Sequence, residues 1–225
     1  MKTVIVIDFD NTIGYFKQIV YLLNIIELAQ KRSFNQNDVD NLINLYPNVL
    51  RPRINEILTM IHQMKTQKKI NYFILYTTNR NEKFVNMVVD FIERISGQEK
   101  KYLFDLKVFS LTKDKPINNL LQENIVKSNI PVTLCFVDNK RLIFTEECDG
   151  ITSVFIKCDT YKYLYDIRHI IKLFDYSIYN NLNKKIITKY FAHIYKRSVF
   201  TNLPYQINEM NSIYLINSIN DFCDS

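Results

Sequence analysis

The amino-acid sequence predicts an α/β protein in which a parallel sheet is covered by helices on both faces. Three short apolar runs have the length and composition of fully buried strands, and they lie at residues 3–8, 71–78 and 132–138. Between them, apolar residues recur every three or four positions, as in amphipathic helices. Because strands that are apolar throughout are typical of parallel sheets, this alternation predicts a three-layer fold.

The residue ranges of the expected helices and strands are predicted from the same spacing of apolar residues. Helices are expected over four stretches, residues 17–31, 54–66, 82–95 and 117–128. A weaker strand is expected at 151–158, and the stretch 103–111 is strand-like. The polar segment 33–41 is expected to be a loop. Nothing between the first and third apolar runs is long enough for a large inserted lid domain.

The sequence divides at about residue 160. We expect residues 1–159 to form the α/β core and 160–225 to form a helical extension packed on it, with a helix over 161–176. The stretch 183–197 mixes five basic residues with three aromatic ones. Such a stretch can bind nucleic acid through phosphates and base stacking, but an amphipathic helix docked on the core is the favoured interpretation.

The net charge, the cysteine content and the length of the apolar runs limit which partners and which compartment are expected. The chain of 225 residues carries a formal charge of +6, a mild basic excess that does not by itself indicate nucleic-acid binding. Its four cysteines show neither metal-ligand spacing nor a pairing pattern, which favours reduced thiols in the cytoplasm or nucleus. No apolar run approaches the roughly 18 residues of a membrane span, so no membrane partner is expected. The oligomeric state stays open.

The first apolar run ends in two acids, Asp8 and Asp10. In extended backbone, side chains two positions apart point to the same side, so these carboxylates are expected to share one pocket. Two neighbouring carboxylates need a cation or a shared proton, and Mg²⁺ suits carboxylate oxygens and phosphate. Asp8 could then attack phosphorus while Asp10 exchanges protons with the leaving group and water. The alternative is that both acids only cap a turn, with the help of Thr12.

Four motifs in order resemble those of the haloacid dehalogenase (HAD) superfamily, a family with a Rossmann-like fold. "IDFDNTI" resembles its first motif, which implies Asp8 as the nucleophile and Asp10 as the acid/base. "FILYTTN" resembles the second, which implies that Thr77 binds the phosphoryl group, with Thr78 as the alternative. "DKPINNLL" matches the third at Lys115, with Lys113 as the fallback.

"LCFVDN" resembles the fourth motif and implies metal binding by Asp138 and Asn139 together with Asp8 and Asp10. The resemblance also implies Mg²⁺ as cofactor and substrate contacts from a further set of polar residues: Thr12, Thr78, Asn79 and Arg51.

A narrower resemblance concerns the segment "LRPRINEIL" at 50–58. It is similar to the segment before the second motif in phosphatases of the RNA polymerase II carboxy-terminal domain, the NLI-interacting-factor-like proteins, and especially in those of large DNA viruses. This resemblance implies a protein phosphatase acting on phosphoserine or phosphothreonine, in a host cell or virion if the protein is viral. The chain departs from that group at Asn11, where glutamate is usual, and at Asn139, where a second acid is common.

The absence of a large lid favours a phosphate presented on a protein loop, because small metabolites need closed, dry pockets. Two alternatives stay open. One is a nucleic-acid end phosphatase, and the other is a catalytically weak structural or interaction protein that has the same fold.

Overall fold

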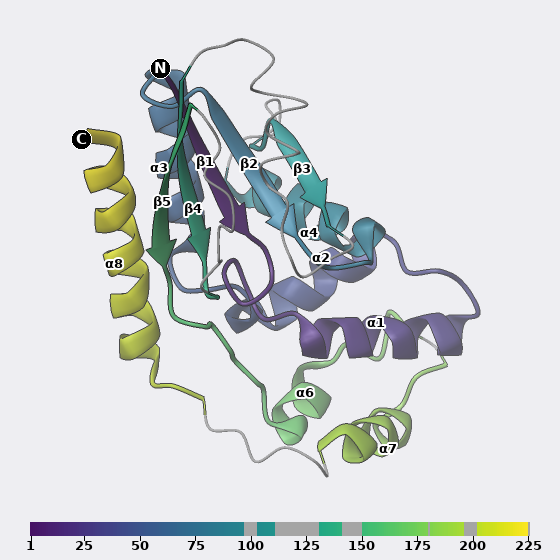
Figure 1. Cartoon of the computed structure of the whole chain (residues 1–225). Coiled ribbons are helices and arrows are strands. Elements are labelled where there is room, and N and C mark those ends of the chain that lie inside the picture. The colour runs from purple at the N-terminus through teal and green to yellow at the C-terminus, as the bar shows by residue number, and fades with distance from the viewer. Residues whose placement is uncertain (97–102, 111–130, 141–149, 180, 196–201, 225) are drawn as a thin grey trace.

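The computed structural model has the expected α/β architecture, built on a five-stranded sheet in which every strand is parallel to its neighbours (Figure 1). It describes residues 1–96, 103–110, 131–140, 150–179, 181–195 and 202–224. The strands are β1 (Lys2–Asp8), β2 (Tyr72–Thr77), β3 (Leu106–Phe109), β4 (Val132–Asp138) and β5 (Ile151–Lys157). The three predicted apolar strands and the weaker strand at 151–158 are confirmed, and β3 forms within the strand-like stretch 103–111.

The strand order is β3-β2-β1-β4-β5. From β1 the chain first builds outward through β2 and β3, and it then returns to the other side of β1 to add β4 and β5. The order therefore reverses between β1 and β4. In open parallel sheets, ligands bind beyond the carboxyl ends of the strands at such a point of reversal.

Seven α-helices and one 3₁₀ helix surround the sheet in the described residues. They are α1 (Lys17–Gln30), α2 (Gln36–Leu45), η1 (Pro47–Val49), α3 (Ile54–Thr66), α4 (Glu82–Ile95), α6 (Ile167–Leu173), α7 (Lys184–Tyr195) and α8 (Tyr205–Asp224). The first three predicted helices are confirmed, whereas the stretch 117–128 lies outside the described residues. None of the described helices is long and apolar enough to cross a membrane.

The central strand β1 is buried on both faces of the sheet. Ile5 and Ile7 of β1 point to one face and join the apolar sides of the helices in a single large cluster. Val4 and Val6 point to the other face and pack with neighbours such as Phe136 in a second cluster. The continuous apolar character of β1 thus reflects burial on both sides, as expected for a central parallel strand.

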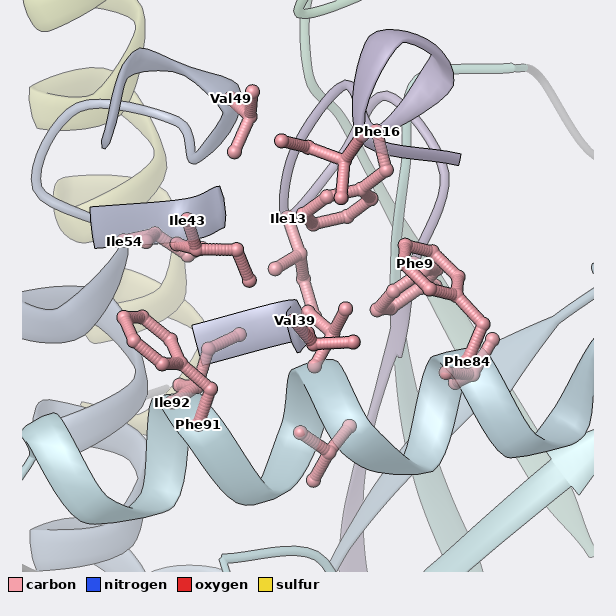
Figure 2. Close-up of a cluster of buried hydrophobic side chains, with 14 of the residues drawn as sticks. Phe9, Ile13, Phe16, Val39, Ile43, Val49, Ile54, Phe84, Phe91 and Ile92 are labelled. Atoms are coloured by element: carbon pink, nitrogen blue, oxygen red, sulfur yellow. The ribbon is translucent and has the colours of Figure 1, made fainter. Parts of the chain in front are cut away.

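The structure contradicts the expected loop at 33–41, because α2 begins at Gln36. Asn35 caps this helix: its side chain accepts a hydrogen bond from the Asp38 amide, and the Asp38 carboxylate accepts one from the Asn35 amide. This reciprocal capping box satisfies two amide groups at the helix start. Val39 and Ile43 of α2 then pack into a buried cluster beside α4 (Figure 2).

The extension is helical, as expected, and it contributes to the main core. Helices α6 and α7 lie near α1, beyond the carboxyl ends of the strands, whereas α8 runs along β5 and contacts α3 (Figure 1). Phe191 of α7 and Ile219 of α8 are fully buried in the same cluster as the sheet. The boundary at residue 160 stays a prediction.

The expected helix over 161–176 is wrong in its first part, since only α6 (Ile167–Leu173) forms. Residues 161–166 are irregular because their backbone groups bond to other segments. The Tyr161 amide donates to the Asn11 carbonyl, and the Tyr165 amide donates to the Gln18 side chain. Asp166 then caps α6 through a bond from the Arg168 amide.

Candidate functional site

Two of the predicted acids end adjacent strands at the point where the strand order reverses. Asp8 is the last residue of β1 and Asp138 is the last residue of β4. Ile7 pairs with Val137 in the parallel register, so the two acids follow at matching positions. Both acids act electrostatically on the same residue, Tyr76. Burial raises the pKa of Tyr76 to about 12, and the negative charges of Asp8 and Asp138 raise it further.

Asp8 is nearly buried, with an exposed fraction of 6%. The hydroxyl of Thr12 donates a hydrogen bond to Asp8 Oδ2 across 3.2 Å. Thr12 itself is fully buried, so in this structure its hydroxyl serves the Asp8 carboxylate.

Asp10 belongs to the loop after β1 and lies toward β2. The Thr77 hydroxyl donates to Asp10 Oδ2 across a long 3.4 Å, and the Asn79 amide nitrogen lies 3.5 Å from Oδ1. The Asn79 main-chain amide in turn donates to the Thr77 hydroxyl at 2.9 Å. Thr77 is buried and Thr78 is exposed, so Thr77 is the hydroxyl that faces Asp10.

The loop from residue 9 to residue 16 is held by its own turn and by apolar anchors. Asn11 has a φ of 65°, a left-handed conformation that asparagine adopts more readily than most residues, and its amide donates to the Gly14 carbonyl. Phe9 and Phe16 stack with ring centroids 4.8 Å apart, and Phe16 meets Phe84 of α4 edge to face (Figure 2). The loop thus points its apolar side chains into the core.

Gly14 lies where this loop comes close to Val49, the last residue of η1. A Cβ atom at this position would lie 2.5 Å from the Val49 carbonyl oxygen and 2.6 Å from the Phe16 ring. The Tyr15 amide donates to the same Val49 carbonyl at 2.7 Å. Glycine is therefore required here by the close contact of two backbone segments.

The end of β4 is tied to the chain that follows β5. Asp138 Oδ1 accepts a hydrogen bond from the Lys140 amide, and the Asp138 carbonyl accepts one from the Cys158 amide. The Asn139 amide nitrogen donates to the Thr160 hydroxyl at 3.0 Å. Asn139 Oδ1 is the atom of this amide that suits a cation.

The donor set fits a magnesium ion in its chemistry. Among the described residues, no group of three or more His, Cys, Asp or Glu side chains lies together as a metal site. Mg²⁺ commonly binds through one or two carboxylates, with water and substrate oxygens completing its shell. Asp8 and Asp138 at adjacent strand ends meet that requirement, whereas Asp10 is directed to Thr77 and Asn79.

Two of the expected site residues call for separate comment. Lys115, and the fallback Lys113, lie outside the described residues. Arg51, expected to contact substrate, has an exposed fraction of only 1% and donates to the main-chain carbonyls of Asn11, Thr12 and Asp159.

Sequence reasoning missed the contribution of the segment after β5. Cys158 is buried, and its thiol lies 3.7 Å from the Thr12 hydroxyl. Burial raises the pKa of this thiol, although the nearby Arg51 charge opposes that effect. The Tyr161 amide reaches the Asn11 carbonyl from the same segment. No local pattern in the sequence signals these long-range contacts.

The chain matches no family model, no curated protein and no solved structure. The resemblance to HAD enzymes therefore depends on the four sequence motifs alone.

Proposed function

We propose that this protein is a magnesium-dependent phosphatase that forms an aspartyl-phosphate on Asp8 and acts on phosphoserine or phosphothreonine in a protein. One observation carries the proposal: residues from three separate motifs gather at one edge of the sheet, beside the point where the strand order reverses. These residues are Asp8, Asp10, Thr77 and Asp138.

The proposed reaction has two steps. In the first, an Asp8 oxygen forms a bond to phosphorus while the ester oxygen leaves with a proton from Asp10. In the second, Asp10 takes a proton from water as the water attacks the phosphorus and releases Asp8. The hydroxyl of Thr12 holds Asp8, while Thr77 and Asn79 hold Asp10.

The negative charge of a bound phosphoryl group needs positively charged or hydrogen-bonding groups beside it. In this proposal Asp8, Asp138 and Asn139 would hold Mg²⁺, which would neutralise charge on the phosphoryl oxygens. The contact of Thr77 with the phosphoryl group and the second positive charge from Lys115 are both assigned on the basis of their motifs alone.

The proposal of a protein substrate is supported by the segment between β1 and β2. Its helices α1, α2 and α3 place residues such as Leu22, Leu42 and Leu58 in the same buried cluster as the sheet. These helices therefore belong to the core, and none of them forms a separate lid domain. Because the described residues form no such lid, the site suits a phosphate on an exposed loop.

The direct test is magnesium-dependent hydrolysis of an aryl phosphate, compared with a phosphoserine peptide and a 3′-phosphorylated oligonucleotide. We expect hydrolysis of the aryl phosphate and the peptide, lost on chelation and in Asp8→Asn. A strong preference for the oligonucleotide would favour the nucleic-acid end phosphatase. Failure on all three substrates, with protein shown to be folded, would contradict the proposal and favour the non-catalytic alternative.

A further inference from the structure

Arg51 is the largest fully buried side chain in the described part of the chain. It lies just before α3, and its own amide donates to the Ile13 carbonyl at 2.9 Å. A guanidinium loses its hydration when it is buried, which is costly unless its N–H groups find acceptors. The positions of those acceptors therefore indicate what the residue does.

Two of its nitrogens bond to the loop that carries the acids. Nε donates to the Thr12 carbonyl at 2.6 Å, and Nη2 donates to the Asn11 carbonyl at 3.1 Å. These two carbonyls belong to the left-handed turn between Asp10 and Ile13. Arg51 thus fixes the backbone at the residue whose hydroxyl bonds to Asp8.

The same guanidinium also reaches the segment after β5. Nη2 donates to the Asp159 carbonyl at 2.6 Å, and the guanidinium carbon lies 5.4 Å from the centre of the Tyr161 ring. Tyr161 closes the arrangement, because its amide donates to the Asn11 carbonyl at 2.8 Å. Arg51 therefore joins the loop after β1 to the chain that also holds Asn139 through Thr160.

Stability alone does not account for this residue. Nη1 has no hydrogen-bond partner among the described atoms, so one buried donor is left unsatisfied. What a guanidinium adds is a rigid planar fork that donates in two directions at once, which a lysine ammonium on its flexible stem does not reproduce.

We propose that Arg51 is a positioning residue that sets the geometry of Asp8 by holding the Asn11 and Thr12 carbonyls against the segment after β5. The proposal deepens the function proposed above and rests on it for its kinetic test. It replaces the substrate contact expected for Arg51 from the sequence.

The kinetic test compares Arg51→Lys with Arg53→Lys. Arg53 is a matched control, because its side chain is partly exposed and pairs with Glu56 on the surface. We expect Arg51→Lys to lower kcat for the aryl phosphate about 100-fold, the order of loss caused by a misplacement of about 1 Å. KM should change little, because the substrate contacts remain. Arg53→Lys should leave both constants unchanged.

Thr12→Val separates positioning from a general loss of stability. This change removes the hydroxyl that bonds to Asp8 and keeps the shape of the side chain. If Arg51 acts through Thr12, the double variant should lose little more kcat than either single variant, whereas independent effects would multiply. Full activity in Thr12→Val, or a loss in Arg51→Lys that is confined to thermal stability, would overturn the inference.

Hydrogen exchange supplies a measurement that needs no activity. Arg51→Lys should accelerate exchange of the Tyr161 amide, which bonds to Asn11, relative to the Val6 amide in β1. Arg53→Lys should leave both amides unchanged. If the parent protein hydrolyses no phosphate, the proposed function fails, and unchanged exchange at Tyr161 would then overturn the role of Arg51 as well.

Discussion

Gln18 and Tyr165 exchange two hydrogen bonds between helix α1 and the irregular segment before α6. The Gln18 side chain donates from Nε2 to the Tyr165 carbonyl at 2.9 Å and accepts at Oε1 from the Tyr165 amide at 2.8 Å. Gln18 belongs to α1 and has an exposed fraction of 3%. The buried side chain of Gln18 thus forms both hydrogen bonds with the main chain of Tyr165, as a neighbouring strand would, and it fixes the irregular segment before α6 to α1.

We expect Gln18→Met to lower the free energy of unfolding by about 2–6 kcal/mol. The variant keeps the length of the side chain but leaves the amide and carbonyl of Tyr165 unsatisfied, at a cost of roughly 1–3 kcal/mol for each buried group. Chemical denaturation monitored by circular dichroism measures the difference. Gln63→Met on the exposed side of α3 is the control and should stay within about 0.5 kcal/mol of the parent. Equal stabilities for the two variants would contradict this account.

Asp38 should make the stability of α2 depend on pH. Burial raises the pKa of its carboxyl, but hydrogen bonds from Arg32 and the Asn35 amide outweigh burial and leave the pKa below its ordinary value of 3.8. A lowered pKa in the folded state means that ionised Asp38 stabilises the fold above the ordinary value, and that this stabilisation is lost as the pH falls through the folded-state pKa.

Asp38→Asn should therefore be less stable than the parent by about 1 kcal/mol at pH 7, because the amide loses the charged pair with Arg32. The difference should shrink in acid, as measured by denaturation at a series of pH values. A difference that stays constant from pH 7 to pH 2 would show that the carboxylate charge is not responsible.

Gly14→Ala should disturb the acid-bearing loop. The added methyl group meets the Val49 carbonyl and the Phe16 ring, so the loop must shift, at about 1–3 kcal/mol for overpacking, and activity should fall with it. Gly150→Ala is the informative comparison, because nothing lies within 4 Å of a Cβ there and only its φ of 82° is unfavourable. That variant should lose about 1–2 kcal/mol of stability and keep its activity. Unchanged turnover in Gly14→Ala would mean that the loop tolerates the shift.

The two acids after β1 should differ in their effects on turnover. Asp8→Asn should abolish hydrolysis with the fold intact, because the amide keeps the shape but cannot attack phosphorus. Asp10→Asn should slow the reaction by about 10²–10⁴, the usual contribution of a positioned acid or base. The control is Asp90→Asn on the exposed side of α4. Activity of Asp8→Asn within a few-fold of the parent would exclude the covalent mechanism.

The strands and the first three predicted helices could be read from the sequence because their signals are local and strong. Continuous apolar runs define β1, β2 and β4, and 3.6-residue periodicity defines α3 and α4 almost to the residue. Since parallel strands present their carboxyl ends at one edge, the meeting of Asp8 and Asp138 followed from the same reasoning.

The missed features depend on other kinds of signal. Helix α2 is short and polar, and its start was marked only by the asparagine and aspartate of its capping box. The irregular course of residues 161–166 is set by acceptors far away in sequence, Asn11 and Gln18. The burial of Arg51 was likewise unpredictable, because its acceptors are backbone carbonyls, which no side-chain pattern reveals.

The central position of β1 has a consequence for how the protein reaches its fold. Val4 pairs with Tyr72 on one side, and Lys2 pairs with Val132 on the other, so the strand made before all the others has neighbours that are synthesised much later. Chains dominated by such distant pairings fold slowly, and their apolar strands stay exposed to aggregation in the meantime. Asp8 can face Asp138 only once β4 has joined the sheet. Fragments that stop short of β4 should therefore lack the pair of Asp8 and Asp138 altogether.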